Sequence, residues 1–389
     1  MYLINANIIT MEETNYPQGF LHLEGSLIRR VGPMQELGST GEEEVLDLQG
    51  KTVYPGFIDG HCHMGLGEEG LDFEGDDLNE MTDPVTPHLR GLDAINPLND
   101  SFPEAVRAGI TCVVTGPGSA NPIGGQFYAI KTYGRNVDKM LLKSPAAMKF
   151  ALGENPKKTY NNKEEAPMTR MATAALIREQ LQKARRYMED LQRAEEDEEG
   201  EIDPPDFDAK CEALLPVLRR QLKAHFHCHR ADDILTALRI AREFDLDLVL
   251  VHCTEGYRIA EDLAEAGVTA ICGPLMTTRS KPELAHSTDA NPGLLSKAGI
   301  EVSLCTDYNV MPIGLLPICA GMAVREGMDY DAALRALTIN PARTCGIEDR
   351  VGSIRPGKDA DLVVFSADPL TLAAKPDLVF INGRIVHKA

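Results

Sequence analysis

Residues 54–63 read YPGFIDGHCH, an apolar segment that ends in two histidines. Successive side chains on a β-strand point to opposite faces, so His61 and His63 share one face while Cys62 points to the other. Two neutral imidazoles on one face, at the carboxyl end of a strand, can bind a metal ion together. A single pair of this kind is a weak indication, and its meaning depends on further ligands elsewhere in the chain.

Other apolar segments also end in histidine or aspartate. His225, His227 and His229 alternate along one predicted strand, which gives the three rings a common face. His252 and Asp307 each end a further apolar run. Among the alternating histidines, His227 is the expected metal ligand and His229 the expected substrate contact. His225 is expected to lie deeper, as a core or supporting residue.

Eight segments of the central region have the composition of β-strands, and several are followed by helical patterns. They are residues 57–63, 110–115, 126–132, 146–152, 222–229, 246–252, 268–273 and 300–306. This alternation predicts an α/β fold, a (β/α)8 TIM-like barrel, over residues 55–353, with a doubly wound open sheet as the main alternative. In a barrel, the carboxyl ends of the strands meet on one face, where the active sites of this fold are built.

The two ends of the chain have a different texture, with short strands separated by turns. Residues 1–54 and 354–389 predict a small composite β-sandwich domain formed from both chain termini. Within the barrel region, residues 169–193 carry apolar side chains at spacings of three and four, which predicts a long amphipathic helix. The acidic segment 195–206 follows, so we expect an inserted helix and a solvated acidic loop at about 160–210.

The overall composition limits the class of partner. The 389 residues carry a net charge of −20, which disfavours binding to nucleic acid or to an anionic membrane. No segment reaches the roughly 18 apolar residues of a membrane helix, and no secretory signal pattern is present.

Nine cysteines without a CxxC pair indicate reduced thiols in a cytoplasmic protein. The expected partner is a small-molecule substrate. A homo-oligomer is a common default, and the oligomeric state stays open.

Four motifs together resemble the amidohydrolase superfamily of metal-dependent hydrolases: PGFIDGHCH, the strand-end histidines, CTD at 305–307 and RPGKDADLVVF at 355–365. The resemblance covers nearly the whole chain and is closest to the imidazolonepropionase-like and prolidase-like branch. It implies that the composite β-domain is an accessory of the barrel. It also implies a set of metal ligands, namely His61, His63, His227, His252 and Asp307.

The fourth predicted strand bears on the metal count. Binuclear members of the superfamily carry a carboxylated lysine there, which bridges two metals. Lys149 is the only charged residue of the apolar segment 146–152, and a buried neutral amine can add carbon dioxide. An unmodified Lys149 paired with an acid such as Glu154, beside a single metal, is the alternative. We expect one or two divalent ions, with zinc the first choice, although manganese, iron and nickel suit the same ligands.

The resemblance implies hydrolysis of a carbon–nitrogen bond in an amide, a peptide or a cyclic amide. A bound metal would generate hydroxide from water at neutral pH, with Asp307 as general base and then general acid. His229 is expected to assist catalysis and to contact the substrate. Further substrate contacts are expected from Arg230, Tyr128 and Arg279.

Two other functions stay open at this point. A deaminase on the same scaffold usually carries a glutamate three residues after the fifth-strand histidine. Counted from His227, that position is Arg230, but Glu255 stands three residues after His252. The third hypothesis is a non-catalytic scaffold protein that keeps the fold without the metals.

Overall fold

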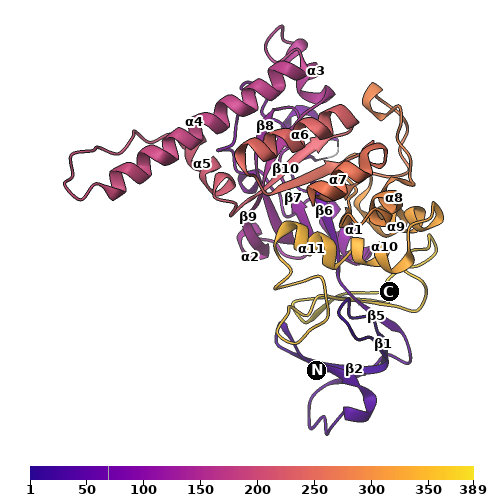
Figure 1. The fold of residues 1–389 in the computed structure, drawn as a ribbon. Helices are drawn as coiled ribbons and strands as arrows, with labels where there is room; N and C mark the ends of the chain where they lie inside the picture. The colour runs from indigo at the N-terminus through magenta and orange to yellow at the C-terminus, as the bar shows by residue number, and fades with distance from the viewer. Residues whose placement is uncertain (69) are drawn as a thin grey trace.

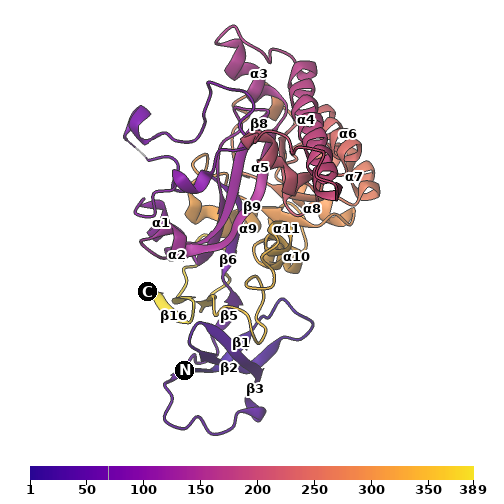
Figure 2. The same ribbon diagram turned by 90° about the vertical axis from the view of Figure 1, so that its left-hand side faces the viewer.

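Two eight-stranded sheets organise the computed structural model, which describes residues 1–68 and 70–389 (Figure 1). One sheet forms a barrel and the other combines the two ends of the chain. Figure 2 shows the terminal sheet at the opposite end of the molecule from α3 (Glu154–Asn161), the helix that follows the carboxyl end of a barrel strand. The mouth of the barrel therefore faces away from the terminal sheet.

The barrel strands follow one another in chain order around the sheet. They are β6 (Phe57–Cys62), β7 (Ile110–Thr115), β8 (Ile123–Lys131), β9 (Leu141–Ala151), β10 (Lys223–Cys228), β11 (Leu248–His252), β12 (Thr269–Cys272) and β13 (Val302–Leu304). Each overlaps one of the eight predicted segments, and the nearly closed α/β barrel is confirmed. At the mouth, the Asp307 amide donates to the His61 carbonyl and the His63 amide to the Tyr308 carbonyl, which joins the first strand to the last.

Strand β8 departs from the regular β/α alternation. It pairs antiparallel with both β7 and β9, whereas the other paired neighbours in the barrel are parallel. A parallel connection needs a crossover of about a dozen residues or more, but only residues 116–122 join β7 to β8. The chain therefore turns back, and the start of β8 lies at the mouth, where Ile123 pairs with Phe150.

Helices cover the outside of the barrel in both views. They are α1 (Ser101–Arg107), α2 (Val137–Met140), α3, α4 (Arg170–Glu196), α5 (Ala209–Leu218), α6 (Ala231–Phe244), α7 (Ala260–Ala266), α8 (Asn291–Lys297), α9 (Leu316–Arg325), α10 (Tyr330–Ala336) and α11 (Ile339–Cys345). Short 3-10 turns are η1 (Met34–Glu36), η2 (Asp72–Gly75), η3 (Gly91–Asp93), η4 (Gly256–Ile259), η5 (Pro282–Leu284) and η6 (Ile313–Leu315). None of the described helices has the length and apolar content that a bilayer crossing demands.

The long amphipathic helix predicted from spacing is α4. Thr169 caps its start by accepting a hydrogen bond from the Ala172 amide, and Ile177 and Leu181 on its apolar face join the main core. With α5 it forms an arm that projects from the barrel, and the acidic segment 195–206 connects the two helices at the tip (Figure 1).

The terminal sheet joins both ends of the chain, as predicted. Its order is β16-β15-β14-β5-β1-β2-β3, with β4 beside β1, and β5 pairs with β14. The strands are β1 (Tyr2–Ile8), β2 (Tyr16–Glu24), β3 (Leu27–Pro33), β4 (Val45–Asp47), β5 (Thr52–Pro55), β14 (Leu362–Phe365), β15 (Leu378–Ile381) and β16 (Arg384–Lys388). A separate core, which includes Leu21 and Phe380, lies on this sheet. The predicted domain limits at residues 54 and 354 stay a prediction.

A buried ion cluster connects the barrel to the terminal sheet. Lys131, the last residue of β8, pairs with Asp359 at 2.9 Å and also with Asp361. Burial raises the pKa of Asp361, and the positive charge of Lys131 opposes that rise. Both carboxylates belong to the segment RPGKDADLVVF, so this motif anchors one sheet to the other.

Replacement of this lysine should destabilise the whole protein. In Lys131→Met, two buried carboxylates lose their shared cation, and we expect the free energy of unfolding to fall by about 3–5 kcal/mol. Urea denaturation measures the change. Lys183→Met is the matched control, because Lys183 forms an exposed ion pair with Asp208 and should cost less than about 1 kcal/mol. Equal stabilities of the two variants would contradict the anchoring role.

Candidate metal centre

His61, His63 and Asp307 form the first group of converging ligand atoms, all within 4.8 Å of one another. Asp307 Oδ1 lies 3.3 Å from His63 Nε2 and 3.8 Å from His61 Nε2. Cys62, between the two histidines on β6, belongs instead to the main hydrophobic core. The alternation expected along this strand is therefore observed, and it directs both imidazoles to the mouth.

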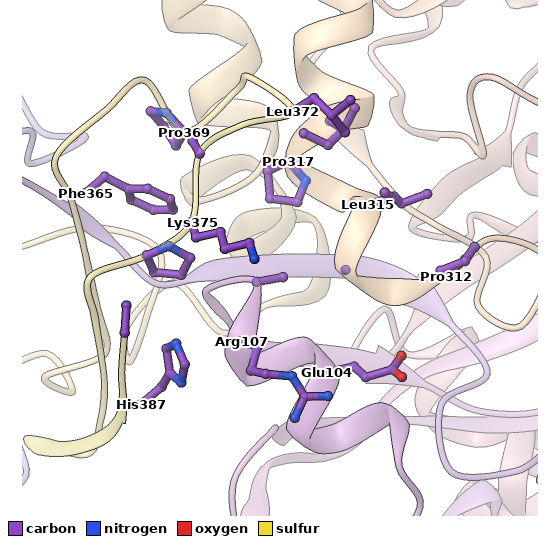
Figure 3. Close-up of a pocket in the computed structure, with 16 residues that line it drawn as sticks. Glu104, Arg107, Pro312, Leu315, Pro317, Phe365, Pro369, Leu372, Lys375 and His387 are labelled. Atoms are coloured by element: carbon purple, nitrogen blue, oxygen red, sulfur yellow. The ribbon is translucent and has the colours of Figure 1, made fainter.

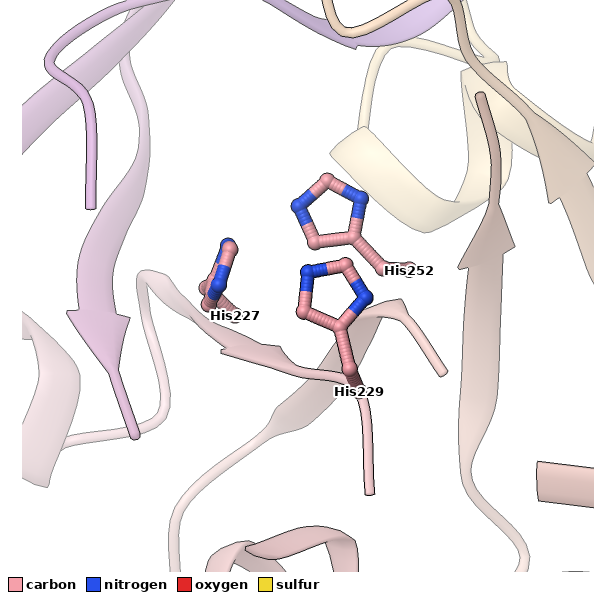
Figure 4. A group of neighbouring side chains, drawn as sticks. All are labelled: His227, His229 and His252. Atoms are coloured by element: carbon pink, nitrogen blue, oxygen red, sulfur yellow. The ribbon is translucent and has the colours of Figure 1, made fainter. Parts of the chain in front are cut away.

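His227, His229 and His252 form the second group, contributed by the ends of β10 and β11 (Figure 4). Their ring centroids are separated by 4.5 Å for His227–His252, 4.6 Å for His229–His252 and 4.7 Å for His227–His229. The rings of His61 and His252 are 5.8 Å apart. The two groups thus share one mouth.

The orientation of His252 depends on an unusual backbone conformation. Along β11, Val249 and Val251 pack in an inner cluster, whereas Leu250 packs in the outer core. Strict alternation would direct His252 outward with Leu250. His252 instead has φ +69°, in the left-handed region, and its ring reaches the mouth. Residues other than glycine rarely adopt this conformation, and when they do they cluster at functional sites.

Backbone carbonyls determine which ring nitrogen is free in two of the histidines. His63 Nδ1 lies 2.7 Å from the Gly116 carbonyl, and His252 Nδ1 lies 2.7 Å from the Gly273 carbonyl. A carbonyl only accepts, so each Nδ1 carries a proton, and Nε2 is the ring nitrogen that is left to bind a ligand. The Nε2 atoms of His252 and His229 are buried, and residues 1–68 and 70–389 offer them no hydrogen-bond partner. Buried polar atoms of this kind need a partner, and a divalent cation fits this donor set.

The protonation states also suit a cation. Burial is the main cause that lowers the pKa of His61, His227 and His229 well below its ordinary value, and it lowers the pKa of His252 to about 4. Burial alone would raise the pKa of Asp307, but the nearby His252 and His63 hold it down to about 2. At neutral pH these four imidazoles are therefore neutral and Asp307 is ionised, the forms that bind metal.

Lys149, on β9, reaches the same mouth. It is completely buried, and its Nζ lies 2.9 Å from His61 Nε2. Burial lowers the pKa of this amine to about 8. Among the described residues no acid lies within ion-pair distance of Lys149, and the Glu154 carboxylate instead accepts from the Glu283 amide. The pairing with Glu154 that we considered from the sequence is not formed. His225 lies beside Lys149 in the strand register, deeper than His227.

The remaining predicted substrate contacts, Arg230, Tyr128 and Arg279, have different surroundings in the structure. Arg230 forms a two-point ion pair with Asp232, at the start of α6. The Tyr128 hydroxyl donates to Gln126 within the core. Arg279 lines a hollow of about 660 Å³ that His252 also lines. Arg279 thus shares a hollow with a residue of the metal centre. The roles of the three side chains stay predictions.

Four residues of the mouth were not singled out from the sequence. Asp59 is buried and accepts hydrogen bonds from the His61 amide and from Thr306, and burial raises its pKa to about 7. Its place in the motif DGHCH was an available signal. Asn155 lies in the first turn of α3, and Lys281 and Glu283 lie at the 3-10 turn η5. No periodic pattern pointed to them.

A second hollow, of about 620 Å³, lies away from the metal centre (Figure 3). Apolar side chains such as Phe365 and Leu372 line it, together with Arg107, Lys375 and His387. None of the converging histidines or Asp307 contributes to its wall. Both groups of candidate metal ligands therefore lie at the mouth of the barrel and not in this second hollow.

Two histidine-rich groups at the mouth of an α/β barrel are consistent with the binding of divalent metal. Residues 52–386 match the amidohydrolase family. The chain belongs to this family, and the resemblance inferred from its motifs is confirmed.

Three relatives illustrate the match. The crystal structure of an amidohydrolase from Thermotoga maritima MSB8 shares 40% identity and a TM-score of 0.94, with 100% of both chains covered. Amidohydrolase tasK of Hapsidospora irregularis is 30% identical over 94% of this chain and 39% of its own length. The chain thus spans about two fifths of that relative. Imidazolonepropionase of Fusobacterium nucleatum subsp. nucleatum is 23% identical over 95% of this chain and 92% of its own.

The metal-free protein should lose stability as the pH falls below about 6.5. Unfolded histidines bind protons near that pH, whereas burial lowers the pKa of the buried rings, to about 3 in His225. The unfolded state then binds more protons, and stability decreases with falling pH. The raised pKa values of three buried carboxyls act in the opposite direction, but the five rings outnumber them; these carboxyls are Asp59, Asp233 and Asp361. The rings are His61, His225, His227, His229 and His252.

Urea midpoints of chelator-treated protein at about pH 7.5 and about pH 5.5 measure this effect. The metal-loaded protein is the comparison and should resist acid better, because bound ions favour neutral rings. A midpoint that stays level in the chelator-treated sample would argue against burial of neutral histidines.

Proposed function

We propose that this protein is a metal-dependent amidohydrolase that cleaves the carbon–nitrogen bond of an amide, a peptide or a cyclic amide. The observation that carries the proposal is the convergence of two ligand groups at one barrel mouth. Membership of the amidohydrolase family supports hydrolysis as the reaction. The expected partner is a small-molecule substrate.

We assign His61, His63 and Asp307 to one divalent ion, and His227 and His252 to a second, with zinc as the first choice. A carboxylated Lys149 would bridge the two. In its unmodified form the Lys149 amine lies against His61 Nε2, the nitrogen whose lone pair would bind the metal. Carboxylation would replace this donor by two acceptor oxygens, which suits a buried amine whose pKa is lowered. When bound, such ions lower the pKa of water from 15.7 to about 7 and polarise a carbonyl.

Asp307 is the proton carrier in this proposal. Its carboxylate is ionised at neutral pH and faces His63. It accepts the proton of the attacking water as the new carbon–oxygen bond forms. It then returns that proton to the nitrogen as the carbon–nitrogen bond breaks. His229 Nε2 has no hydrogen-bond partner among the described residues and faces the same space, so it is available to the substrate.

The geometry around Glu255 favours the hydrolase over the deaminase. Its carboxylate accepts from the Ala231 amide at 3.0 Å and lies 3.6 Å from Arg258. It therefore stabilises the start of α6 and does not join the ligand groups. The presence of every candidate ligand at one mouth disfavours a scaffold without metals.

Asp307→Asn should retain the fold and lose about 10²–10⁴-fold in kcat, because an amide cannot carry the proton. Dipeptides, N-acyl amino acids and cyclic amides form the substrate panel, and ammonia release from aromatic amines tests the deaminase. Elemental analysis of the same sample separates loss of metal from loss of proton transfer. Asp190→Asn, on the exposed arm, is the control. Full turnover by metal-loaded Asp307→Asn would remove Asp307 from this role.

The metal count tests the bridging lysine. Elemental analysis should give about two equivalents per chain for the natural sequence and about one for Lys149→Met, which lacks the bridge. Lys143→Met is the matched control, since Lys143 lies on the same strand and contacts the Cys345 carbonyl away from the site. One equivalent in the natural sequence would exclude the bridged pair, and none would contradict a metal-dependent enzyme.

A further inference from the structure

We propose that Lys281 is the anion-binding residue of this site and that the substrate carries a carboxylate close to the bond that is cleaved. The inference rests on the proposed function, which it deepens by naming a substrate class. That class comprises N-acyl amino acids, dipeptides and cyclic amides with a free carboxylate, as opposed to neutral amides.

The ammonium group of Lys281 is held in place but not saturated. Its Nζ lies 2.6 Å from Glu283 Oε1 and 3.1 Å from Asn155 Oδ1. An ammonium has three N–H donors, and the described residues supply no partner for the third. The side chain is 26% exposed. One N–H donor of the ammonium is therefore available to a ligand that enters from solvent, while the positive charge is shared with Glu283.

Glu283 fixes the position of this charge. It is only 1% exposed, and its second oxygen accepts from the Glu154 amide at 2.9 Å. A buried carboxylate is costly unless it is paired, so Glu283 keeps Lys281 at this place. Gly153 gives the carboxylate room, because a Cβ there would lie 2.8 Å from Glu283 Oε2. The cation is thus positioned before any ligand binds.

The same two partners of Lys281 contact the metal centre. Asn155 Nδ2 lies 3.3 Å from His227 Nε2, and Glu283 Oε1 lies 3.6 Å from His229 Nε2. After burial and neighbouring rings, the positive charge of Lys281 contributes to the lowered pKa of both histidines. A carboxylate bound to Lys281 would therefore lie next to the second ligand group, where the reacting bond must be.

Other cations near the mouth are less suited to this task. The Arg230 guanidinium is engaged by Asp232 at two points, and Arg279 donates to the Ser287 carbonyl on the wall of the hollow. The chain as a whole carries a charge of −20, which repels anions at long range. Binding therefore depends on a short-range contact, and a charge-assisted hydrogen bond from the Lys281 ammonium to a carboxylate is among the strong ones.

The experiment uses the metal-loaded full chain and substrates offered in pairs, each as the free acid and as its carboxyl-terminal amide. Lys281→Met should raise KM about 10–100-fold for the acid and leave the amide nearly unchanged, with kcat and metal content retained. Lys281→Arg should recover part of the loss. Lys375→Met, in the hollow of Figure 3, is the control and should have no effect. Equal changes for acid and amide would make Lys281 a structural residue and overturn the proposal.

Two additions keep the test decisive. Lys281→Met leaves Glu283 buried without its cation, so the double variant Lys281→Met/Glu283→Gln replaces it if the single variant fails to fold. Calorimetry with levulinate, the ketone analogue of N-acetylglycine that has no carbon–nitrogen bond, and with its neutral methyl ester measures binding without turnover. Acid-selective binding that is lost in the variant would support Lys281 even if no substrate were hydrolysed, in which case only the proposed function fails. Absence of acid selectivity in the natural sequence would overturn the inference while hydrolysis of amides stood.

Discussion

Asp59 joins the first and last strands of the barrel through a completely buried carboxylate. One oxygen accepts from the His61 amide at 3.1 Å, and the other accepts from the Thr306 amide at 3.0 Å and the Thr306 hydroxyl at 2.6 Å. The adjacent His61 carbonyl accepts from the Asp307 amide at 3.3 Å. Three donors satisfy a group that would otherwise be costly to bury. This closure brings His61 and His63 to Asp307, and the first ligand group depends on it.

Around this junction of the first and last strands, the chain maintains a site whose free energy is unfavourable without a cation. The rings of His229 and His252 are neutral because they are buried, and in the part of the chain that the structure describes their Nε2 atoms lack hydrogen-bond partners. His252 and Asp307 both have positive φ angles. Desolvation, unpaired nitrogens and backbone strain all lower stability, and proteins keep such features where function requires them. The separate core of the terminal sheet and the buried Lys131 cluster supply stability elsewhere.

The loops that surround the metal centre connect it to the inserted arm. Arg170, the first residue of α4, donates to Asp233 at 2.9 Å, and a Cβ at Gly153 would lie 3.1 Å from the same carboxylate. Gly153 in turn lies against Glu283, which holds Lys281. The arm is therefore packed against the groups that position the mouth, while the acidic segment at its tip stays remote from them.

Local patterns were sufficient for the strands, the helix α4 and the histidines at strand ends, because alternation and helical spacing report which face of an element is buried. By itself, the sequence thus determined a barrel with a histidine-rich mouth. The reversal of β8, the inward turn of His252 and the contact of Lys149 with His61 came only from the tertiary structure. So did the meeting of Lys281 and Glu283 with Asn155. These features depend on short connections, on strained backbone and on contacts between segments that are far apart in the chain. None of them leaves a periodic signal in the sequence.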